Sequence, residues 1–480
     1  MSRVLVIDAG TSSVRAAIVG ADANVTCGHH QTVPVQSPST GFVELDAVAL
    51  ARAALAVAGD ALAEGGPVDA VGIANQRAST VVWDRATGEP VGPGIGWQDL
   101  RTVAMCLLLQ GQGLRLAPNA SATKLAVLLD MADLARTRDL CFGTVDSWLA
   151  WTLSGGDVHV TDATNAGLTG LVLPDVSGWD PAVLEALRIP GDVLPAIVDS
   201  SGVMGHASAL PGAPPIAGMA GDQQASLVGQ GCTRPGLAKL TFGTGGMLDV
   251  CVGHRPAFEG RGPQGCFPVV AWRRDGVDTW GVEAVMLSAG SCVAWLRDEL
   301  GLLASVAESD AVAAGAPRGG DVWFVPALAG LGTPTWDFGA RGALLGLAGD
   351  TTRAEIVRAG LEGIAHRGAD LVEAAEADAG PSLASLRVDG GMSANGTFVQ
   401  LLADTTQRPV EVSPVVEATT LGAAFLAGMA VGMWADEAEV AATWSPSRIV
   451  EPGRRRDRER WRSMVARAAG TVPELSALSF

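Results

Sequence analysis

Three short turns in the sequence combine glycine with hydroxyl side chains, and each directly follows an apolar segment. They lie at 8–13 (DAGTSS), 243–246 (GTGG) and 389–395 (DGGMSAN). Glycine lets the backbone approach a ligand closely, and backbone N–H groups with Ser or Thr hydroxyls bind phosphate oxygens. A single turn of this kind is equally typical of an ordinary hairpin, but three together favour a phosphate site. Asp8, which leads the first turn, could hold Mg²⁺ through water molecules.

A candidate general base follows a Pro/Gly-rich stretch, in the tetrapeptide Gly-Asp-Gln-Gln at 221–224. Asp222 could accept the proton of a substrate hydroxyl during phosphoryl transfer. The alternative is that Asp222 caps a helix, because Asp is a favoured N-cap residue. The tetrapeptide alone leaves both interpretations open.

Two polar segments, Asn-Gln-Arg at 75–77 and Trp-Gln-Asp-Leu-Arg at 97–101, could bind a polyhydroxylated ligand. Amide and guanidinium groups hydrogen-bond hydroxyls, and an indole ring supplies an apolar wall. A pair of surface strands with a buried Trp explains the same residues equally well.

The elements that must position these residues form a mixed pattern. Apolar segments at 3–7 and 14–19 flank the first turn, and segments at 237–242 and 247–252 flank the second, which indicates a weak internal repeat. Further strands are expected at 71–74, 79–83 and 385–389. Helices are expected at 46–63, 122–135, 145–153, 285–299, 353–377, 395–406 and 419–432. This mixture predicts an α/β protein whose natural boundary lies near 229–235.

Composition excludes several classes of protein. The 480 residues carry 33 Lys+Arg against 51 Asp+Glu, a formal net charge of -18, so nucleic acid and anionic membrane surfaces are poor partners. Neither of the two lysines follows a glycine, which excludes a Walker-type phosphate loop. The 7 cysteines form no C-x-x-C pair and predict reduced thiols and a cytoplasmic protein.

Two other segments have simple structural interpretations. Residues 418–435 carry no charge, but their composition and the four-residue spacing of large apolar side chains favour a buried helix over a membrane span. The run RRRDRER at 454–460 is expected to form the solvated face of a last helix.

The sequence resembles the FGGY carbohydrate kinases, and among them the glycerol kinases most, over nearly its whole length. The most specific stretches are VGIANQR (71–77), TVVWD (80–84), WQDLRT (97–102), FGTVDSWL (142–149), VHVTD (158–162), GDQQ (221–224), TFGTG (241–245), VDGG (388–391) and TLGAA (420–424).

The resemblance implies a two-domain fold like that of actin, hexokinase and the Hsp70 ATPase, with ribonuclease-H-like domains around a central cleft. Residues 1–231 would bind the substrate and residues 232–480 the nucleotide. It implies ATP and Mg²⁺ as cofactors, a small polyol or sugar as substrate, and allows a homo-oligomer.

The resemblance also carries roles to individual residues. Asp222 resembles the catalytic base and, with Asp8, a group near the metal. The implied substrate-binding residues are Arg77, Trp97, Asn119, Asp222 and Gln223. The implied nucleotide and phosphate contacts are Thr11, Ser12, Ser13, Arg15, Thr244, Gly290, Gly391 and Asn395.

Three positions depart from the glycerol kinase pattern. Ala78 replaces a Glu and Asn119 replaces a Tyr, both of which contact the polyol, and Ala294 replaces a Gln on the nucleotide side. Losing a charge-assisted hydrogen bond of roughly 1.5–3 kcal/mol weakens recognition, and smaller side chains widen the pocket. We therefore predict a substrate other than glycerol, a somewhat larger polyol or ketose. Two alternatives remain: a true glycerol kinase, and a non-catalytic sugar-binding or assembly protein on the same fold.

Overall fold

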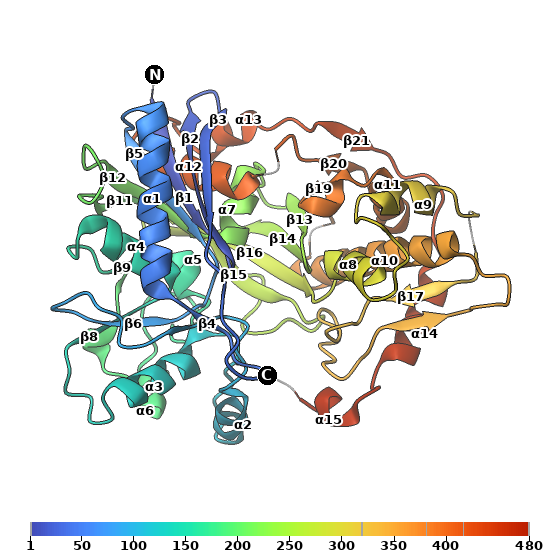
Figure 1. The fold of residues 1–480 in the computed structure, drawn as a ribbon, viewed down its shortest axis with the longest axis horizontal. Coiled ribbons are helices and arrows are strands. Elements are labelled where there is room, and N and C mark those ends of the chain that lie inside the picture. The colour runs from blue at the N-terminus through green and yellow to red at the C-terminus, as the bar shows by residue number, and fades with distance from the viewer. Residues whose placement is uncertain (1, 318–319, 381, 416, 479–480) are drawn as a thin grey trace.

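A single large sheet forms the centre of the protein, described here from a computed structural model of residues 2–317, 320–380, 382–415 and 417–478 (Figure 1). In spatial order its 13 strands in this part of the chain are β21 (Arg448–Val450), β20 (Val410–Val412), β19 (Leu386–Asp389), β13 (Ala238–Phe242), β14 (Gly246–Gly253), β16 (Val277–Met286), β15 (Phe267–Arg274), β11 (Ser201–His206), β12 (Pro215–Gly221), β5 (Ala70–Asn75), β1 (Arg3–Ala9), β2 (Ser13–Gly20) and β3 (Val25–Thr32). Strands from the two halves of the chain meet where β11 pairs with β15.

Smaller strand pairs and helices surround this sheet. The pairs are β4 (Glu44–Leu45) with β7 (Gly94–Ile95), β6 (Val81–Asp84) with β8 (Leu140–Gly143), β9 (Val160–Asp162) with β10 (Ala196–Val198), and β17 (Trp323–Val325) with β18 (Ala343–Leu345). The helices are α1 (Ala47–Gly65), α2 (Val103–Gly111), α3 (Ser121–Ala132), α4 (Val145–Ser154), α5 (Ala163–Ala166), α6 (Pro181–Leu187), α7 (Asp222–Gly229), α8 (Gly290–Asp298), α9 (Glu308–Ala314), α10 (Arg353–Ala379), α11 (Gly396–Thr406), α12 (Ala418–Ala430), α13 (Glu437–Ala442), α14 (Arg458–Ala468) and α15 (Pro473–Ser476), with 3₁₀ turns η1 (Gly191–Val193) and η2 (Gly391–Ala394).

Both expected hairpins are present. β1 pairs antiparallel with β2, and β13 pairs antiparallel with β14. Each hairpin joins parallel neighbours: β1 lies beside β5, which lies beside β12, and β13 lies beside β19, which lies beside β20. Since parallel strands end at the same edge, each half gathers its strand-to-helix turns in one place.

The helix predicted over 285–299 is wrong at its start. β16 continues to Met286, and α8 begins only at Gly290. Both backbone groups of Val285 bond to Thr333, since its N–H donates to Thr333 Oγ1 and its carbonyl accepts from the Thr333 N–H. A short apolar run fits a buried strand as well as a helix, so the pattern could not separate them.

Helix α12 is buried, as predicted for the uncharged segment. It packs across β12, β5 and β1 and crosses α7 at very close range. A Cβ added to Gly422 would lie 1.7 Å from the Ala225 carbonyl oxygen, so only glycine fits this crossing. In the part of the chain that the structure describes, every helix is too short or too polar to cross a membrane. Because α12 covers strands of the first half, the division at residue 231 stays a prediction.

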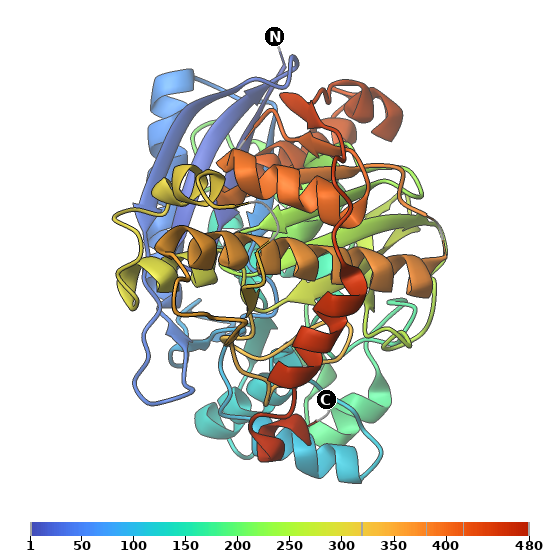
Figure 2. The same cartoon turned by 90° about the vertical axis from the view of Figure 1, so that its right-hand side faces the viewer.

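The arginine-rich run is exposed at most of its positions, as expected, but Arg456 and Arg458 are not part of that solvated face. Helix α14 lies over α10, where Figure 2 shows it in red near the C-terminus. The side chains of Arg456 and Arg458 are only 8% and 13% exposed, because each pairs with acidic residues. The density of charge in the run predicted that its side chains are exposed to solvent. The acidic partners of these two arginines lie in distant segments of the chain, which the run itself does not reveal.

Candidate active site

Three parallel strands of the first half bring the main candidate residues to one edge. Ala9 of β1 is in register with Asn75 of β5, and Asn75 with Gly221 of β12. The strand ends therefore place Asp8, Arg77 and Asp222 next to one another. Arg77 Nε lies 3.3 Å from Asp222 Oδ1.

Asp222 is the first residue of α7, and the preceding Gly221 is the N-cap. Its Oδ1 accepts a hydrogen bond of 2.8 Å from the Gln223 N–H. Desolvation by the surrounding residues raises the pKa of Asp222, while the Arg77 charge and the Gln223 N–H act in the opposite direction. Even so, 33% of the side chain stays exposed, so the carboxylate can meet a ligand from solvent.

The negative charges of Asp8 and Asp222 repel each other. Desolvation and then the negative charge of Asp222 raise the pKa of Asp8 to about 7, and the neighbouring Arg15 opposes the shift. A divalent cation would relieve this repulsion, so the two carboxylates fit Mg²⁺. Across the described residues there is no cluster of three or more His, Cys, Asp or Glu suited to a metal. Mg²⁺ held here would therefore complete its ligand set with water and phosphate oxygens, which it prefers.

A buried charge network continues from Arg77 into the second half. Arg77 Nη1 lies 2.6 Å from Glu283 Oε2, and Glu283 is in register with Asp249. Lys239 Nζ lies 2.8 Å from Asp249 Oδ2 and also donates to Gln223 Oε1. Desolvation raises the pKa of Asp249 to about 6, with the Lys239 charge opposing it.

Sequence reasoning missed three members of this network: Lys239, Asp249 and Glu283. A usable signal exists, because each is a charge inside an otherwise apolar strand, and charges are seldom fully buried without partners. Gln223, by contrast, was expected at the site and lies there, bonded to Lys239.

The glycine turns of the second half lie against one another. The Gly290 N–H donates to the Gly243 carbonyl at 2.9 Å, and the Ala289 N–H donates to the Thr244 carbonyl at 2.8 Å. A Cβ on Gly390 would lie 2.4 Å from the Phe242 carbonyl oxygen, so the 389–395 turn adjoins the same hairpin. Asn395 caps α11 by accepting from the Phe398 N–H at 2.8 Å.

The spaces in front of two of these glycines suit a phosphate. A Cβ added to Gly243 or Gly391 would meet no atom within 4 Å, so the backbone is open to a ligand there. Ser226 of α7 donates to Asp389 at 3.1 Å, which ties the helix of Asp222 to this set of turns.

The first hairpin turn contacts the expected substrate wall. Trp97 Nε1 donates to Thr11 Oγ1 at 3.2 Å. Ser12 and Arg15 are exposed, Ser13 is half-buried, and Arg15 stands opposite Asp8 in the β1–β2 register.

Asn119 is exposed and lies just before α3. Its backbone carbonyl accepts a hydrogen bond of 3.0 Å from Lys124 Nζ. Lys124 also donates to the Trp97 carbonyl at 3.1 Å. Burial lowers the pKa of Lys124 to about 7. This lysine joins the two segments that carry Trp97 and Asn119, and no pattern in the sequence predicted that role.

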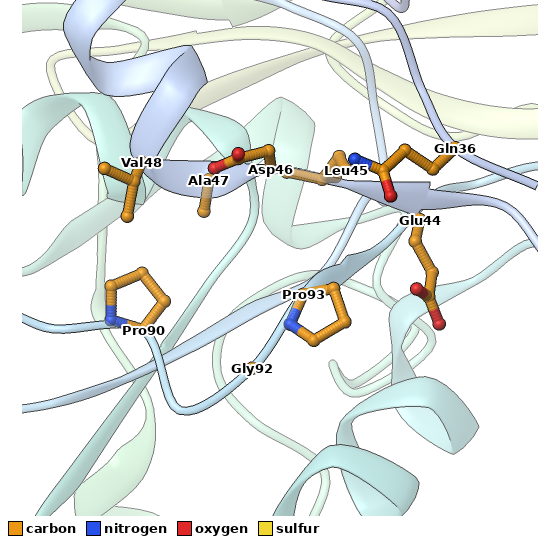
Figure 3. Close-up of a pocket in the computed structure, with 9 residues that line it drawn as sticks. All are labelled: Gln36, Glu44, Leu45, Asp46, Ala47, Val48, Pro90, Gly92 and Pro93. Carbon is orange, nitrogen blue, oxygen red and sulfur yellow. The ribbon is translucent and has the colours of Figure 1, made fainter. Parts of the chain in front are cut away.

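A surface pocket lies away from these residues. Figure 3 shows it between β4, the start of α1 and the loop 90–93, with a volume of about 280 Å³. Its lining residues are Gln36, Glu44, Leu45, Asp46, Ala47, Val48, Pro90, Gly92 and Pro93. None of them belongs to the expected site.

A sheet with two such hairpins, with carboxylates and glycine turns at its strand ends, has the architecture of the actin/hexokinase-like class. A fold alone does not define an activity, so the activity has to come from comparison with known proteins. The description "FGGY family of carbohydrate kinases" matches residues 3–229 for its N-terminal domain and residues 238–431 for its C-terminal domain. The chain therefore belongs to the FGGY family of carbohydrate kinases, and it is a sugar or polyol kinase.

Individual relatives agree with this assignment. A glycerol kinase of Dechloromonas aromatica (strain RCB) is 44% identical over 475 residues, which cover 95% of this chain and 94% of that protein. A glycerol kinase of Trichlorobacter lovleyi is 43% identical and covers 98% of this chain and 99% of its own.

Solved structures confirm the expected fold. The glycerol kinase of Plasmodium falciparum with ADP superposes with a TM-score of 0.89 at 26% identity, covering 100% of this chain and 99% of that one. A xylulose kinase of Lactobacillus acidophilus shares the fold, with a TM-score of 0.85 at 20% identity, covering 98% of this chain and 96% of that one.

Proposed function

We propose that this kinase transfers the γ-phosphoryl group of ATP to a hydroxyl of a small polyol or sugar, with Asp222 as general base. The observation that carries the proposal is the partly exposed Asp222 carboxylate beside Arg77, at the strand edge that also holds Asp8. A base must reach the proton that it removes, and Asp222 is open to an incoming alcohol.

The mechanism depends mainly on positioning and charge. Arg77 and Gln223 bind substrate hydroxyls, and Trp97 forms an apolar wall. Asp222 accepts the proton as the alcohol oxygen attacks the γ-phosphorus in line with the departing ADP. The phosphates lie against the glycine turns, with Thr11, Ser12, Ser13, Arg15 and Thr244 as donors, and Gly290, Gly391 and Asn395 adjoin the nucleotide. Mg²⁺, held near Asp8 and Asp222, supplies charge neutralisation when bound.

The acceptor we propose is a polyol or ketose larger than glycerol. Ala78 is buried beside Arg77, and neither Ala78 nor Asn119 supplies the carboxylate or phenol that the resemblance to glycerol kinases implies at these positions. A missing charge-assisted hydrogen bond lowers affinity for glycerol by roughly one to two decades, at about 1.5–3 kcal/mol.

Glycerol itself is the second candidate, favoured by the 44% identity to the glycerol kinase of Dechloromonas aromatica. A substrate panel from three- to six-carbon polyols and ketoses, read by ADP release, decides between them. The highest kcat/KM for a larger acceptor supports our proposal, and the highest value for glycerol rejects it. Absence of ADP release with every acceptor in the panel rejects both candidates.

A further inference from the structure

Asp162 is a fully buried carboxylate at the end of β9, outside the site described above. It accepts five hydrogen bonds: from Thr164 N–H (3.0 Å) and Oγ1 (2.9 Å), from Asn165 N–H (3.0 Å) and Nδ2 (2.8 Å), and from Ser200 Oγ (2.6 Å). Two of these donors continue to the candidate active site by separate routes.

The first route runs to the general base. Thr164 Oγ1 donates to Asp162, so its lone pairs are free to accept from elsewhere. They accept the Gly221 N–H at 2.9 Å, and Gly221 is the N-cap directly before Asp222. The hydroxyl therefore fixes the backbone from which the Asp222 side chain projects.

The second route runs to the substrate-binding arginine. Asn165 Nδ2 gives one hydrogen to Asp162 and the other to Asn75 Oδ1 at 3.1 Å, while Asn75 Nδ2 donates back to Asn165 Oδ1 at 2.9 Å. Asn75 Nδ2 also donates to the Gln76 carbonyl at 2.9 Å, one residue before Arg77.

Side chains extend this second route further. Gln76 Nε2 donates to the Gly10 carbonyl at 3.0 Å, in the first hairpin turn. Gln76 Oε1 accepts from Ser79 Oγ at 2.9 Å, and Ser79 Oγ accepts from the Trp97 N–H at 3.1 Å. The phosphate turn and the substrate wall are thus joined to the same chain of hydrogen bonds.

We propose that Asp162 is a positioning residue that sets the general base and the substrate-binding arginine in place together, through Thr164 and Asn165. All five contacts are donated to the carboxylate oxygens of Asp162, so each of these neighbours points a donor toward it. This arrangement orients the Thr164 hydroxyl and the Asn165 amide, and through them Gly221 and Asn75. The proposal rests on the proposed function, because it concerns the placement of Asp222 and Arg77.

The test compares variants that each remove one partner of Asp162. Thr164→Val keeps the shape of the side chain but deletes the hydroxyl, whereas Thr164→Ser keeps the hydroxyl. Ser200→Ala is the matched control, because it removes an equally buried hydroxyl from the same carboxylate without a route to the site. Asn165→Leu interrupts the second route. Thermal unfolding and ATP binding are measured for each variant beside kcat and the polyol KM.

We expect Thr164→Val to lower kcat by about 10- to 100-fold, because small displacements of a reacting group are costly. Thr164→Ser and Ser200→Ala should keep kcat near the wild-type value, and ATP affinity should not change. Asn165→Leu should mainly raise the polyol KM. If Thr164→Val does not fold, Thr164→Ala takes its place in the same comparison.

The outcomes separate this proposal from the proposed function. Wild-type protein that turns over no polyol or sugar overturns both. Wild-type turnover with equal kcat in Thr164→Val and Ser200→Ala overturns the positioning role alone, as does a loss that Thr164→Ser does not restore.

Discussion

Arg77 and Glu283 form an ion pair of 2.6 Å between the two halves of the chain, and their side chains are only 12% and 9% exposed. Arg77 lies in the segment matched by the N-terminal FGGY domain and Glu283 in the segment matched by the C-terminal domain. The orientation of the arginine that we assign to the substrate therefore depends on a residue of the other half.

Glu283→Gln should raise the polyol KM by about tenfold or more, because a hydrogen bond to a charged group contributes roughly 1.5–3 kcal/mol. Steady-state kinetics with the preferred acceptor measures the change. Asp278→Asn is the control, since it breaks the Arg273–Asp278 pair, whose side chains are 14% and 18% exposed and which lies away from Arg77. An equal rise in KM in both variants would contradict a specific role for Glu283.

Asp222→Asn should lower kcat by about 10²–10⁴-fold, the usual contribution of a general base, with ATP affinity near the wild-type value. Single-turnover measurements check the expected loss in rate, and nucleotide titration checks that the ATP affinity is unchanged. An active Asp222→Asn protein would remove Asp222 from the mechanism.

The sequence predicted the two hairpins, the buried helix α12 and the position of Arg77 after a strand, because local patterns carry that information. It did not predict β12 before Asp222, since the Pro and Gly residues of that stretch favoured a loop. The alternative that Asp222 caps a helix is wrong, because Gly221 is the N-cap and Asp222 is the first residue of α7, with a partly exposed carboxylate. Glu283 could not be foreseen as the partner of Arg77, since no local pattern links residues 206 positions apart. For the same reason the sequence could not show that Arg456 and Arg458 are paired.

Asp146 should make stability depend on pH. Burial, followed by the nearby Asp162 charge, raises its pKa to about 7 in the folded protein, above the ordinary value of 3.8. The folded state then binds more protons between these values, so this group's contribution is complete below pH 4 and is lost as the pH rises toward 7.

Asp146→Asn should flatten the free energy of unfolding between about pH 4 and 7, measured by chemical denaturation across that range. Asp133→Asn is a control with the opposite pH dependence. Backbone hydrogen bonds, of which that from the Arg138 N–H is the most important, lower the pKa of Asp133. Its contribution to stability is lost only as the pH falls below its ordinary range. Equal slopes in wild-type protein and Asp146→Asn would refute the assignment.

Arg458→Gln should destabilise the protein by roughly 1.5–3 kcal/mol, since it removes one of the two buried arginines that pair with Asp370, while Arg367 remains as the other. The Arg458 guanidinium pairs with Asp370 and lies 2.9 Å from Glu373. Arg462, on the same helix, also lies 2.9 Å from Glu373 but is 63% exposed, so Arg462→Gln should cost at most about 1 kcal/mol. Urea denaturation of the two variants compares them, and similar losses would show that burial is not the deciding factor.

Gly422→Ala should destabilise by about 1–3 kcal/mol or more, because its methyl group would lie 1.7 Å from the Ala225 carbonyl oxygen at the α7–α12 crossing. Gly59 lies within α1, where an added Cβ meets no atom within 4 Å. Gly59→Ala should instead stabilise by roughly 0.5–1 kcal/mol through helix propensity. Thermal unfolding of both variants tests the difference, and a stable Gly422→Ala protein would mean that the two helices can separate.

The position of α12 has a consequence for synthesis on the ribosome. Its residues 418–430 cover apolar side chains of β1, β5 and β12, all of which are translated at least about 190 residues earlier. Until α12 has been synthesised, one apolar face of these N-terminal strands is not covered by it. The core between these strands and α12 can therefore be completed only after residue 430 has been synthesised.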